Sequence, residues 1–253
     1  MALDIAVSCN RGRVRKRNED VVAIGSRLIR DEEKTTRVEC PAERIIVAVA
    51  DGVGGAPGGD QASKIVAGQM LSRLEAVEAG LSPEELAHAA QSAALEVNSD
   101  LIKKSWLGSG RMGMSTTYTA VLGYEGGLFC MHAGDSRLYR FDHDGLRQLT
   151  RDHTLREQLG DPGIPGNIIV NCFGSEDQFY LDFLQLDPLS AEHELLLICS
   201  DGLSDMLGDQ GIAAGFAEPG LDLALAAREL VAAANAAGGM DNISVALLRA
   251  AAG

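Results

Sequence analysis

Short hydrophobic segments, separated by turn residues, recur along the chain at the length of β-strands. Valine, isoleucine, leucine and aromatic residues dominate each segment, a composition typical of strands. The segments predict strands at 3–8, 44–50, 117–123, 127–133, 136–142, 178–186, 194–200 and 243–249. A further strand is expected directly after the acid pair Glu19-Asp20.

Three of these segments follow one another closely between Leu122 and Leu146. Only the turn sequences YEGG, GD and DHDG separate or follow them. Because connections this short join antiparallel neighbours, the pattern predicts a β-meander.

A repeat of three to four residues indicates helices within 60–105 and 202–237. In the first region, Ser82-Pro83-Glu84-Glu85 places serine at an N-cap, proline at the first helical position and glutamate three residues after the cap. This is a capping box, which predicts a helix start near residue 82. Apolar residues from Leu86 to Leu101 then repeat as on one face of an amphipathic helix.

Two polar segments interrupt this regular pattern. Residues 30–43 are expected to form a mobile excursion between two strands. Residues 151–177 mix a short helical pattern with a stretch rich in proline and glycine, which predicts a flap-like insertion over one face. The chain has 253 residues and no internal repeat or low-complexity linker, so we expect one domain spanning 1–253.

Charge and composition exclude several classes of partner. With 22 basic and 36 acidic residues the net charge is −14, which disfavours nucleic acid. No apolar run reaches the length of about 18 residues that spans a membrane, and the N-terminal basic residues follow a short apolar stretch instead of preceding it. We therefore expect a cytoplasmic protein with no membrane segment. The cysteines are isolated, which favours reduced thiols: Cys9, Cys40, Cys130, Cys172 and Cys199.

The glycine-rich sequence VADGVGGAPGGD, residues 49–60, resembles a nucleotide-binding loop but lacks its chemistry. A P-loop requires lysine after its last glycine, and here Gly59 is followed by Asp60. The dinucleotide fingerprint that starts at Gly52 has Pro57, which carries no N–H, in its sixth position. What remains is Asp51 at the carboxyl end of a buried strand, where a charge needs a partner.

Other aspartates occupy similar positions. Asp135 and Asp201 follow apolar strands, Asp241 precedes one, and Asp20 stands at the start of another. A single Asp-Gly after a strand is most often a turn, but strand ends meet along one edge of a sheet, so these carboxylates can converge. Clustered carboxylates repel one another unless cations neutralise them.

Oxygen ligands without histidine or cysteine favour Mg²⁺ or Mn²⁺. Two such ions can share a carboxylate and a hydroxide and promote attack on phosphorus. The adjacent sequence RGRVRKRNED supplies basic residues suited to a phosphate, although a solvated basic turn is the alternative interpretation: Arg11, Arg13, Arg15, Lys16 and Arg17.

Six segments, in order, resemble the motifs of the metal-dependent serine/threonine protein phosphatases of type 2C in their short bacterial form. They are RKRNED, VADGVGGAPGGD, MSTTYTAVL, HAGDSRLYR, CSDGLSD and GGMDNISV, and the resemblance extends from about Asp4 to Leu248. It implies an α+β fold, a four-layer α-β-β-α sandwich of two antiparallel sheets flanked by helices. It also implies hydrolysis of phosphoserine and phosphothreonine by a metal-bridging hydroxide, in bacterial signalling that opposes a serine/threonine kinase.

The resemblance assigns a first set of metal ligands. By position, Asp51 resembles the carboxylate that bridges two tightly bound Mn²⁺ or Mg²⁺ ions, and the carbonyl of Gly52 resembles a ligand of one of them. Asp201 and Asp241 resemble ligands of the first ion.

A second set completes the implied site. Asp20, together with Glu19, resembles the side of the second ion, partly through water, and Asp135 resembles the acid that holds a weaker third ion with Asp201. Arg15 matches the phosphate-binding arginine. The implied partners are phosphorylated proteins, including a serine/threonine kinase or its targets, and the implied state is a monomer.

The chain departs from the family pattern at two places. Val53 stands where many eukaryotic members carry a histidine proposed as general acid, so protonation of the leaving group must come from water or another group. Val170-Asn171 stands where the flap usually has Thr-Arg. Substrate contacts inferred from the family are therefore not transferred to that segment.

Two alternative functions compete with this interpretation. The spacing from Cys9 to Arg15 fits the C-x₅-R pattern of thiolate phosphatases, although Cys9 alternates with Leu3, Ile5 and Val7 on one strand face and is expected to be buried. The other alternative is a binding protein that keeps the fold without activity. Such a protein is expected to have lost metal carboxylates, and this chain retains them.

Overall fold

The protein forms two antiparallel sheets packed face to face. A computed structural model describes residues 2–39, 44–53, 58–109, 113–189, 194–216 and 221–251. The first sheet has the order β4 (Glu33–Glu39), β1 (Ala2–Asn10), β12 (Ile243–Ala250), β11 (Leu195–Cys199), β8 (Arg137–Asp142), β9 (Gly145–Gln148). The second has the order β10 (Asp182–Leu186), β7 (Gly127–Ala133), β6 (Tyr118–Tyr124), β5 (Ile45–Ala50), β2 (Val21–Ile24), β3 (Arg27–Ile29).

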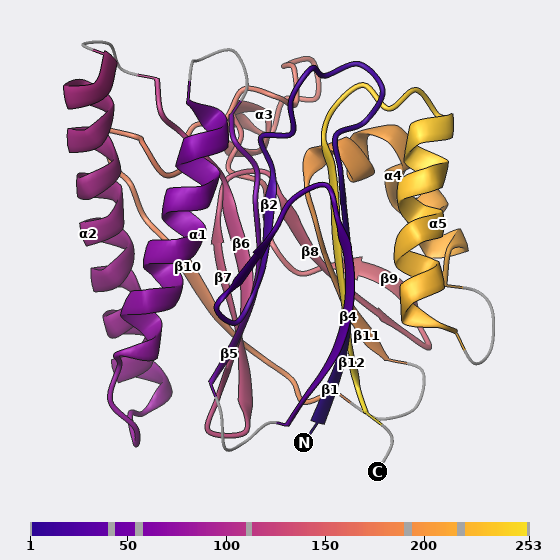
Figure 1. Cartoon of the computed structure of the whole chain (residues 1–253), viewed down its shortest axis with the longest axis horizontal. Helices are drawn as coiled ribbons and strands as arrows, with labels where there is room; N and C mark the ends of the chain where they lie inside the picture. Colours follow the sequence, from indigo (N-terminus) through magenta and orange to yellow (C-terminus); the bar gives the residue numbers. More distant parts are fainter. Residues whose placement is uncertain are drawn as a thin grey trace.

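Helices cover the outer face of each sheet. Helices α1 (Gly59–Glu75) and α2 (Pro83–Ser109) lie on the second sheet, and α4 (Asp201–Ala214) and α5 (Leu223–Ala236) lie on the first (Figure 1). The four-layer α-β-β-α sandwich is confirmed. Strands were predicted close to their observed bounds, except that 178–186 becomes a strand only from Asp182 and that β3, β4 and β9 were not predicted.

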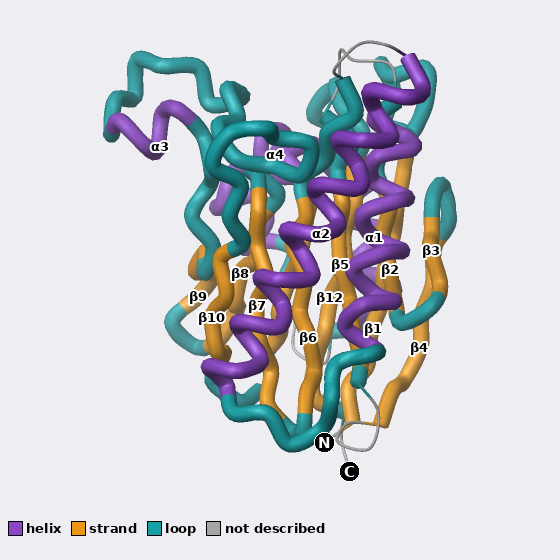
Figure 2. The backbone as a smooth tube through the Cα atoms, turned by 90° about the vertical axis from the view of Figure 1, so that its left-hand side faces the viewer, coloured by secondary structure: helices purple, strands orange, loops and turns teal. Residues whose placement is uncertain are grey.

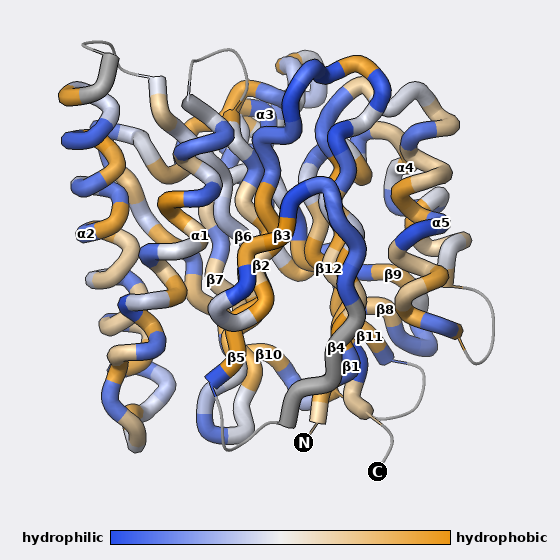
Figure 3. Tube along the Cα trace, viewed as in Figure 1, coloured by the Kyte–Doolittle hydropathy of each residue, from blue (hydrophilic) through white to orange (hydrophobic). Residues whose placement is uncertain are grey.

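Alternating side chains divide the core into layers. In β5, Ile45, Val47 and Val49 pack between the two sheets. The intervening residues Ile46, Ala48 and Ala50 pack against the helical layer of α1 and α2. Successive strand side chains point to opposite faces, so a continuous apolar run such as IIVAVA serves two cores at once. Figure 3 shows this concentration of hydrophobic residues along the strands, with hydrophilic residues in the loops at the upper edge.

The predicted β-meander is wrong. β6 pairs with β7 and β8 pairs with β9, but β7 and β8 belong to different sheets. The short turn between them crosses from one sheet to the other at Gly134, which has a left-handed φ of 119°. A Cβ at Gly134 would lie 2.6 Å from Cβ of Thr117, so the crossing requires glycine. Two hairpins in separate sheets replace the meander.

The predicted mobile excursion at 30–43 is also wrong for half of its length. Residues 33–39 form the edge strand β4, paired antiparallel with β1 from Ala2 opposite Glu39 to Ser8 opposite Glu33. The sequence EKTTRVE is rich in charged residues, as edge strands often are. Residues 40–43 lie outside the described part of the chain.

The capping box at the start of α2 is confirmed. The Glu85 N–H donates to Ser82 Oγ at 3.3 Å, and the Ser82 N–H donates to Glu85 Oε2 at 2.8 Å. Nearly all of the predicted apolar stripe is buried: Leu86, Ala90, Ala93, Ala94, Val97 and Leu101. In the part of the chain that is described, no helix combines the length and apolar character needed to cross a membrane.

The segment 151–177 forms an ordered excursion beside the upper edge of the sandwich (Figure 2). It contains the short helix α3 (Leu155–Leu159), whose first turn is capped by the side chain of Thr154. Isolated β-bridges join Thr154 to Ile169 and Thr116 to Phe173. The first bridge closes the flap on itself, and the second attaches its C-terminal end to the core. The N–H of His153, which donates to the carbonyl of Gly134 at 2.7 Å, attaches the N-terminal end.

Candidate metal centre

The predicted acidic residues meet at one end of the sandwich. Asp51 follows β5, Asp135 lies in the crossing turn after β7, Asp201 begins α4, and Asp241 precedes β12. Together they surround a cavity of about 140 Å³. Its lining comprises Arg15, Glu19, Asp51, Gly52, Val53, Thr117, Asp135, Asn167, Ile169, Asp201 and Asp241.

Asp51 and Gly52 are held by the neighbouring chain segment. The carbonyl oxygen of Asp51 accepts hydrogen bonds from Thr116 Oγ1 at 2.7 Å and from the Thr117 N–H at 2.8 Å. A Cβ at Gly52 would lie 2.5 Å from the carbonyl carbon of Gly59, so the site excludes any side chain here. Residues 54–57 of the glycine-rich loop lie outside the described part.

Asp201 and Asp241 approach one another because two backbones pass in close contact. A Cβ at Gly202 would lie only 1.9 Å from the carbonyl oxygen of Asn242, so glycine after Asp201 lets α4 pack against the segment that carries Asp241. Asp201 also occupies the first turn of α4, where the helix dipole favours negative charge. Its Oδ1 is buried and has no hydrogen-bond partner among the described residues.

The carboxylates have raised pKa values because they are buried together. Burial is the main cause for Asp51 and Asp201, whose pKa values lie well above the usual range, and repulsion from the neighbouring aspartates adds to it. Burial, and then the charge of Asp152, raises the pKa of Asp135 to about 7. Such a cluster is costly to ionise alone and is suited to hard divalent cations. The donor set, all oxygen, therefore fits Mn²⁺ or Mg²⁺.

Asp20 and Glu19 differ in their access to the cavity. The carboxylate of Asp20 is fully buried and accepts hydrogen bonds at its Oδ2 from Ser200 at 2.9 Å and Ser244 at 2.8 Å. Its Oδ1 has no partner among the described residues, and burial raises the pKa of Asp20 to about 6. Glu19, not Asp20, lines the cavity. Asp20 therefore lies behind the carboxylates that line the cavity, in contact with Asp51.

Arg15 is the one member of the basic cluster that lines the cavity. Its Nη2 lies 2.5 Å from Oδ2 of Asp241, and its side chain is 42% exposed. The loop that carries it is fixed by the N–H groups of Arg13 and Val14, which both donate to the carbonyl of Gly239. A guanidinium is thus fixed at the mouth of an acidic cavity.

Comparisons with known proteins agree with this geometry. The sequence profile described as protein phosphatase 2C matches residues 31–234. The chain belongs to the protein phosphatase 2C family. The matched range contains Asp51, Asp135 and Asp201, whereas Asp20 and Asp241 lie outside it. Membership makes the chain a serine/threonine protein phosphatase of the metal-dependent class.

Individual relatives cover nearly all of the phosphatase. The serine/threonine phosphatase stp of Listeria innocua is 29% identical over 249 residues, which span 94% of this chain and 92% of that protein. The serine/threonine protein phosphatase PstP of Mycobacterium tuberculosis is 32% identical over 268 residues, which span 97% of this chain and 44% of PstP. A structure of the PstP catalytic domain with two manganese ions has a TM-score of 0.75 and 29% identity, covering 98% of this chain and 99% of that one.

Several residues that support the site in the phosphatase were not predicted. Asn242 connects the two ends of the chain: its Oδ1 accepts from the Glu19 N–H at 2.8 Å, and its Nδ2 donates to the carbonyls of Arg11 at 2.8 Å and Arg17 at 3.0 Å. The hydroxyls of Ser200 and Ser244 support Asp20 from below. The only signal in the sequence was their position next to Asp201, Asp241 or a strand end.

Cys9 lies in the core, as its alternation predicted. The side chain is 3% exposed and packs between the sheets. Burial, and then the charge of Asp20, raises the pKa of the thiol to about 11, so it stays protonated at neutral pH. Because a thiolate is the nucleophile in cysteine chemistry, the C-x₅-R alternative has no support in the phosphatase.

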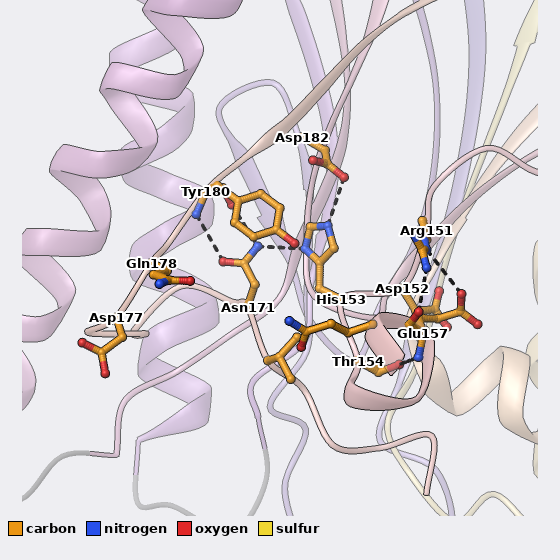
Figure 4. A pocket seen from close by; sticks show the side chains of 12 residues that line it. Arg151, Asp152, His153, Thr154, Glu157, Asn171, Asp177, Gln178, Tyr180 and Asp182 are labelled. Carbon is orange, nitrogen blue, oxygen red and sulfur yellow. Dashed lines mark hydrogen bonds and ion pairs between the residues drawn. The ribbon is translucent and has the colours of Figure 1, made fainter. Parts of the chain in front are cut away.

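The flap separates the metal cavity from a larger one. A cavity of about 580 Å³ opens on its other side and is lined by His153, Val170, Asn171, Tyr180 and Asp182 among others (Figure 4). Ile169 lines the metal cavity and Val170 the larger one, as expected for consecutive residues of an extended segment. Val53 lines the metal cavity, and none of the described residues that line this cavity is a histidine.

Proposed function

We propose that the phosphatase hydrolyses phosphoserine and phosphothreonine on proteins in one step at the metal cavity, using two Mn²⁺ or Mg²⁺ ions and a weaker third. The observation that carries this proposal is the buried set of carboxylates with raised pKa values around one cavity. Bound ions would supply an activated water and positive charge for the phosphoryl oxygens.

Each residue has a distinct proposed role. Asp51 would hold both ions, the carbonyl of Gly52 would bind one of them, and Asp201 and Asp241 would hold the first ion. These four positions are fixed by backbone contacts that leave little room for rearrangement. A rigid arrangement of this kind allows cations to bind without reorganising the protein.

Three further residues complete the proposal. Asp135 would hold the weaker third ion together with Asp201, and Asp20 would support the second from behind, since it is fully buried. Arg15 would bind the phosphate dianion, for which a guanidinium fork is well suited. Because Asp241 already accepts from Arg15 at 2.5 Å, the phosphate would be held next to the first ion.

The decisive experiment compares Asp51→Asn with Cys9→Ser. Phosphate release from p-nitrophenyl phosphate is measured after EDTA treatment and after Mn²⁺ is restored. We expect the wild type and Cys9→Ser to lose activity in EDTA and recover it with Mn²⁺, and Asp51→Asn to lose at least about a thousandfold in kcat. The proposal would be refuted if Cys9→Ser were inactive and EDTA did not lower the activity of the wild type. Trapping a phosphoenzyme would also refute it.

The proposed partners are phosphorylated proteins in the cytoplasm, including a serine/threonine kinase or its targets, and the proposed state is a monomer formed by one domain, 1–253. The net charge of −14 supports a protein partner over nucleic acid. Phosphoproteomics of a strain that lacks the phosphatase tests this: sites that gain phosphate should be serines and threonines. Sedimentation of the purified chain tests the monomer.

A further inference from the structure

His153 lies in the wall between the flap and the two sheets, at the inner end of the larger cavity. Its side chain is 6% exposed. The imidazole lies between the rings of His132, 4.5 Å away, and Tyr180, 4.8 Å away. Figure 4 shows Asn171 and Asp182 directed toward its two nitrogen atoms. The ring is therefore in contact with β7, β10 and the flap at once.

The contacts of the ring define which nitrogen carries the proton. Nδ1 lies 2.8 Å from the amide nitrogen of Asn171 and 3.2 Å from the backbone N–H of Gly134. Both of these groups are donors, since Oδ1 of Asn171 itself accepts from the Tyr180 N–H. Nδ1 must accept from them, and so Nε2 carries the hydrogen and donates to Asp182 Oδ2 at 3.0 Å.

The backbone of His153 also binds the crossing turn and the flap. Its N–H donates to the carbonyl of Gly134 at 2.7 Å, and its carbonyl accepts from the N–H of Val170 at 2.8 Å. Gly134 is thus bound on both sides by one residue, and it directly precedes Asp135. Val170 follows Ile169, which lines the metal cavity. One residue therefore fixes both the crossing turn and the flap wall.

We propose that His153 is a positioning residue that holds Asp135 and the flap wall in place through the acceptor at its Nδ1. This inference rests on the proposed function for the roles of Asp135 and the metal cavity. Among the described residues, the buried N–H of Gly134 has no acceptor other than Nδ1 of His153, and an N–H left without an acceptor in the interior is destabilising. Loss of the Nδ1 acceptor should therefore loosen the turn that carries Asp135.

A matched pair of substitutions separates the two ends of the ring. In His153→Asn, the side-chain oxygen occupies the place of Nδ1 and can accept from Gly134, but nothing reaches Asp182. In His153→Gln, the terminal amide reaches the place of Nε2 and Asp182, but the acceptor at the δ position is lost. If His153 only filled space, His153→Asn would be the more disruptive variant, since asparagine leaves the larger void. His143→Gln, on an exposed residue, is the control.

The first measurement is amide hydrogen exchange of the peptide that covers Gly134 to Ser136, which needs no metal and no activity. We expect His153→Gln to speed exchange there about tenfold or more, and His153→Asn and His143→Gln to stay within about threefold of the wild type. Exchange of a peptide from α5 serves as the reference and should not change. Equal exchange in the two His153 variants, or faster exchange in His153→Asn, would overturn the proposal.

The second measurement is Mn²⁺-dependent hydrolysis of p-nitrophenyl phosphate. We expect His153→Gln to lose about tenfold or more in kcat/KM and His153→Asn to retain most of it. If the wild type shows no Mn²⁺-dependent turnover, the proposed function fails, and the exchange data still decide the role of His153. If turnover is present and the two variants are equally impaired, the function stands and the positioning role is wrong.

Discussion

Substituting Asp20 tests the electrostatics of the site independently of activity. Its carboxylate is fully buried, with one oxygen bound by two serine hydroxyls and the other without a partner among the described residues. In Asp20→Asn the amide oxygen can accept from the same hydroxyls, and the charge is gone. We therefore expect the variant to stabilise the metal-free protein at neutral pH, while weakening the response to Mn²⁺.

The magnitude follows from the pKa of Asp20, which burial raises to about 6 from the ordinary 3.8. The folded state binds this proton more tightly than the unfolded state does. The contribution of Asp20 to stability is therefore fully present below about pH 4 and is lost as the pH rises through 6. At about 1.4 kcal/mol for each unit of pKa difference, the loss at pH 7.5 is about 3 kcal/mol. About half of this loss has occurred by pH 5, so roughly 1–2 kcal/mol remains to appear between pH 5 and 7.5.

The assay compares melting temperatures in EDTA at pH 5 and pH 7.5. The difference in melting temperature between Asp20→Asn and the wild type should be about 3–6 °C larger at pH 7.5 than at pH 5. This uses about 2–4 °C per kcal/mol for a chain of this size. His132, whose pKa burial lowers to about 4, shifts stability the opposite way, but it is present in both proteins and cancels. Asp144→Asn, on an exposed residue, should show no such change.

Two outcomes would refute this reasoning. The first is an advantage of Asp20→Asn that stays constant or shrinks as the pH rises, because a raised pKa requires it to grow. The second is an equal rise in melting temperature for both proteins when Mn²⁺ is added. A ligand stabilises a protein in proportion to its affinity for the folded state, so the wild type should gain more.

Two further predictions concern the substrate side of the cavity. Arg15→Lys keeps the charge but loses the planar fork, so KM for a phosphorylated peptide should rise by about tenfold with a smaller change in kcat, measured by steady-state phosphate release; an unchanged KM would mean that Arg15 does not contact phosphate. Val53→His should add a titrating group beside the leaving oxygen and reshape the pH profile of kcat, while Mn²⁺ binding measured by calorimetry persists. A profile identical to the wild type would place Val53 away from the leaving group.

Local chemistry explains what could be predicted from the sequence. The capping box at Ser82 needs only four consecutive residues, and both of its hydrogen bonds form. Strand alternation also depends on near neighbours, and so Cys9 could be placed in the core. The aspartates were placed together because each follows or precedes a strand, and strand ends collect at one edge of a sandwich.

What failed depended on partners distant in the chain. A two-residue turn between apolar strands gives the same pattern whether the strands pair or diverge, so the sequence could not show that β7 and β8 belong to different sheets. The strand β4 was missed because its polar sequence, EKTTRVE, has no apolar alternation, and only its pairing with β1 makes it a strand. The roles of Asn242 and His153 were hidden for the same reason, since their contacts are with residues far away in sequence.

The pairing of the two chain ends explains why Arg15 and Asp241 meet. β1 and β12 are antiparallel neighbours, with Asn10 opposite Ile243. The loop that leaves β1 and the loop that enters β12 must therefore emerge together at the upper edge, which places Arg15 beside Asp241. Asn242 then binds both Arg11 and Arg17 through one amide. The arginine proposed to bind phosphate and a carboxylate proposed to bind the first ion are thus brought together by a contact between residues 226 positions apart, so this half of the site depends on the pairing of β1 with β12.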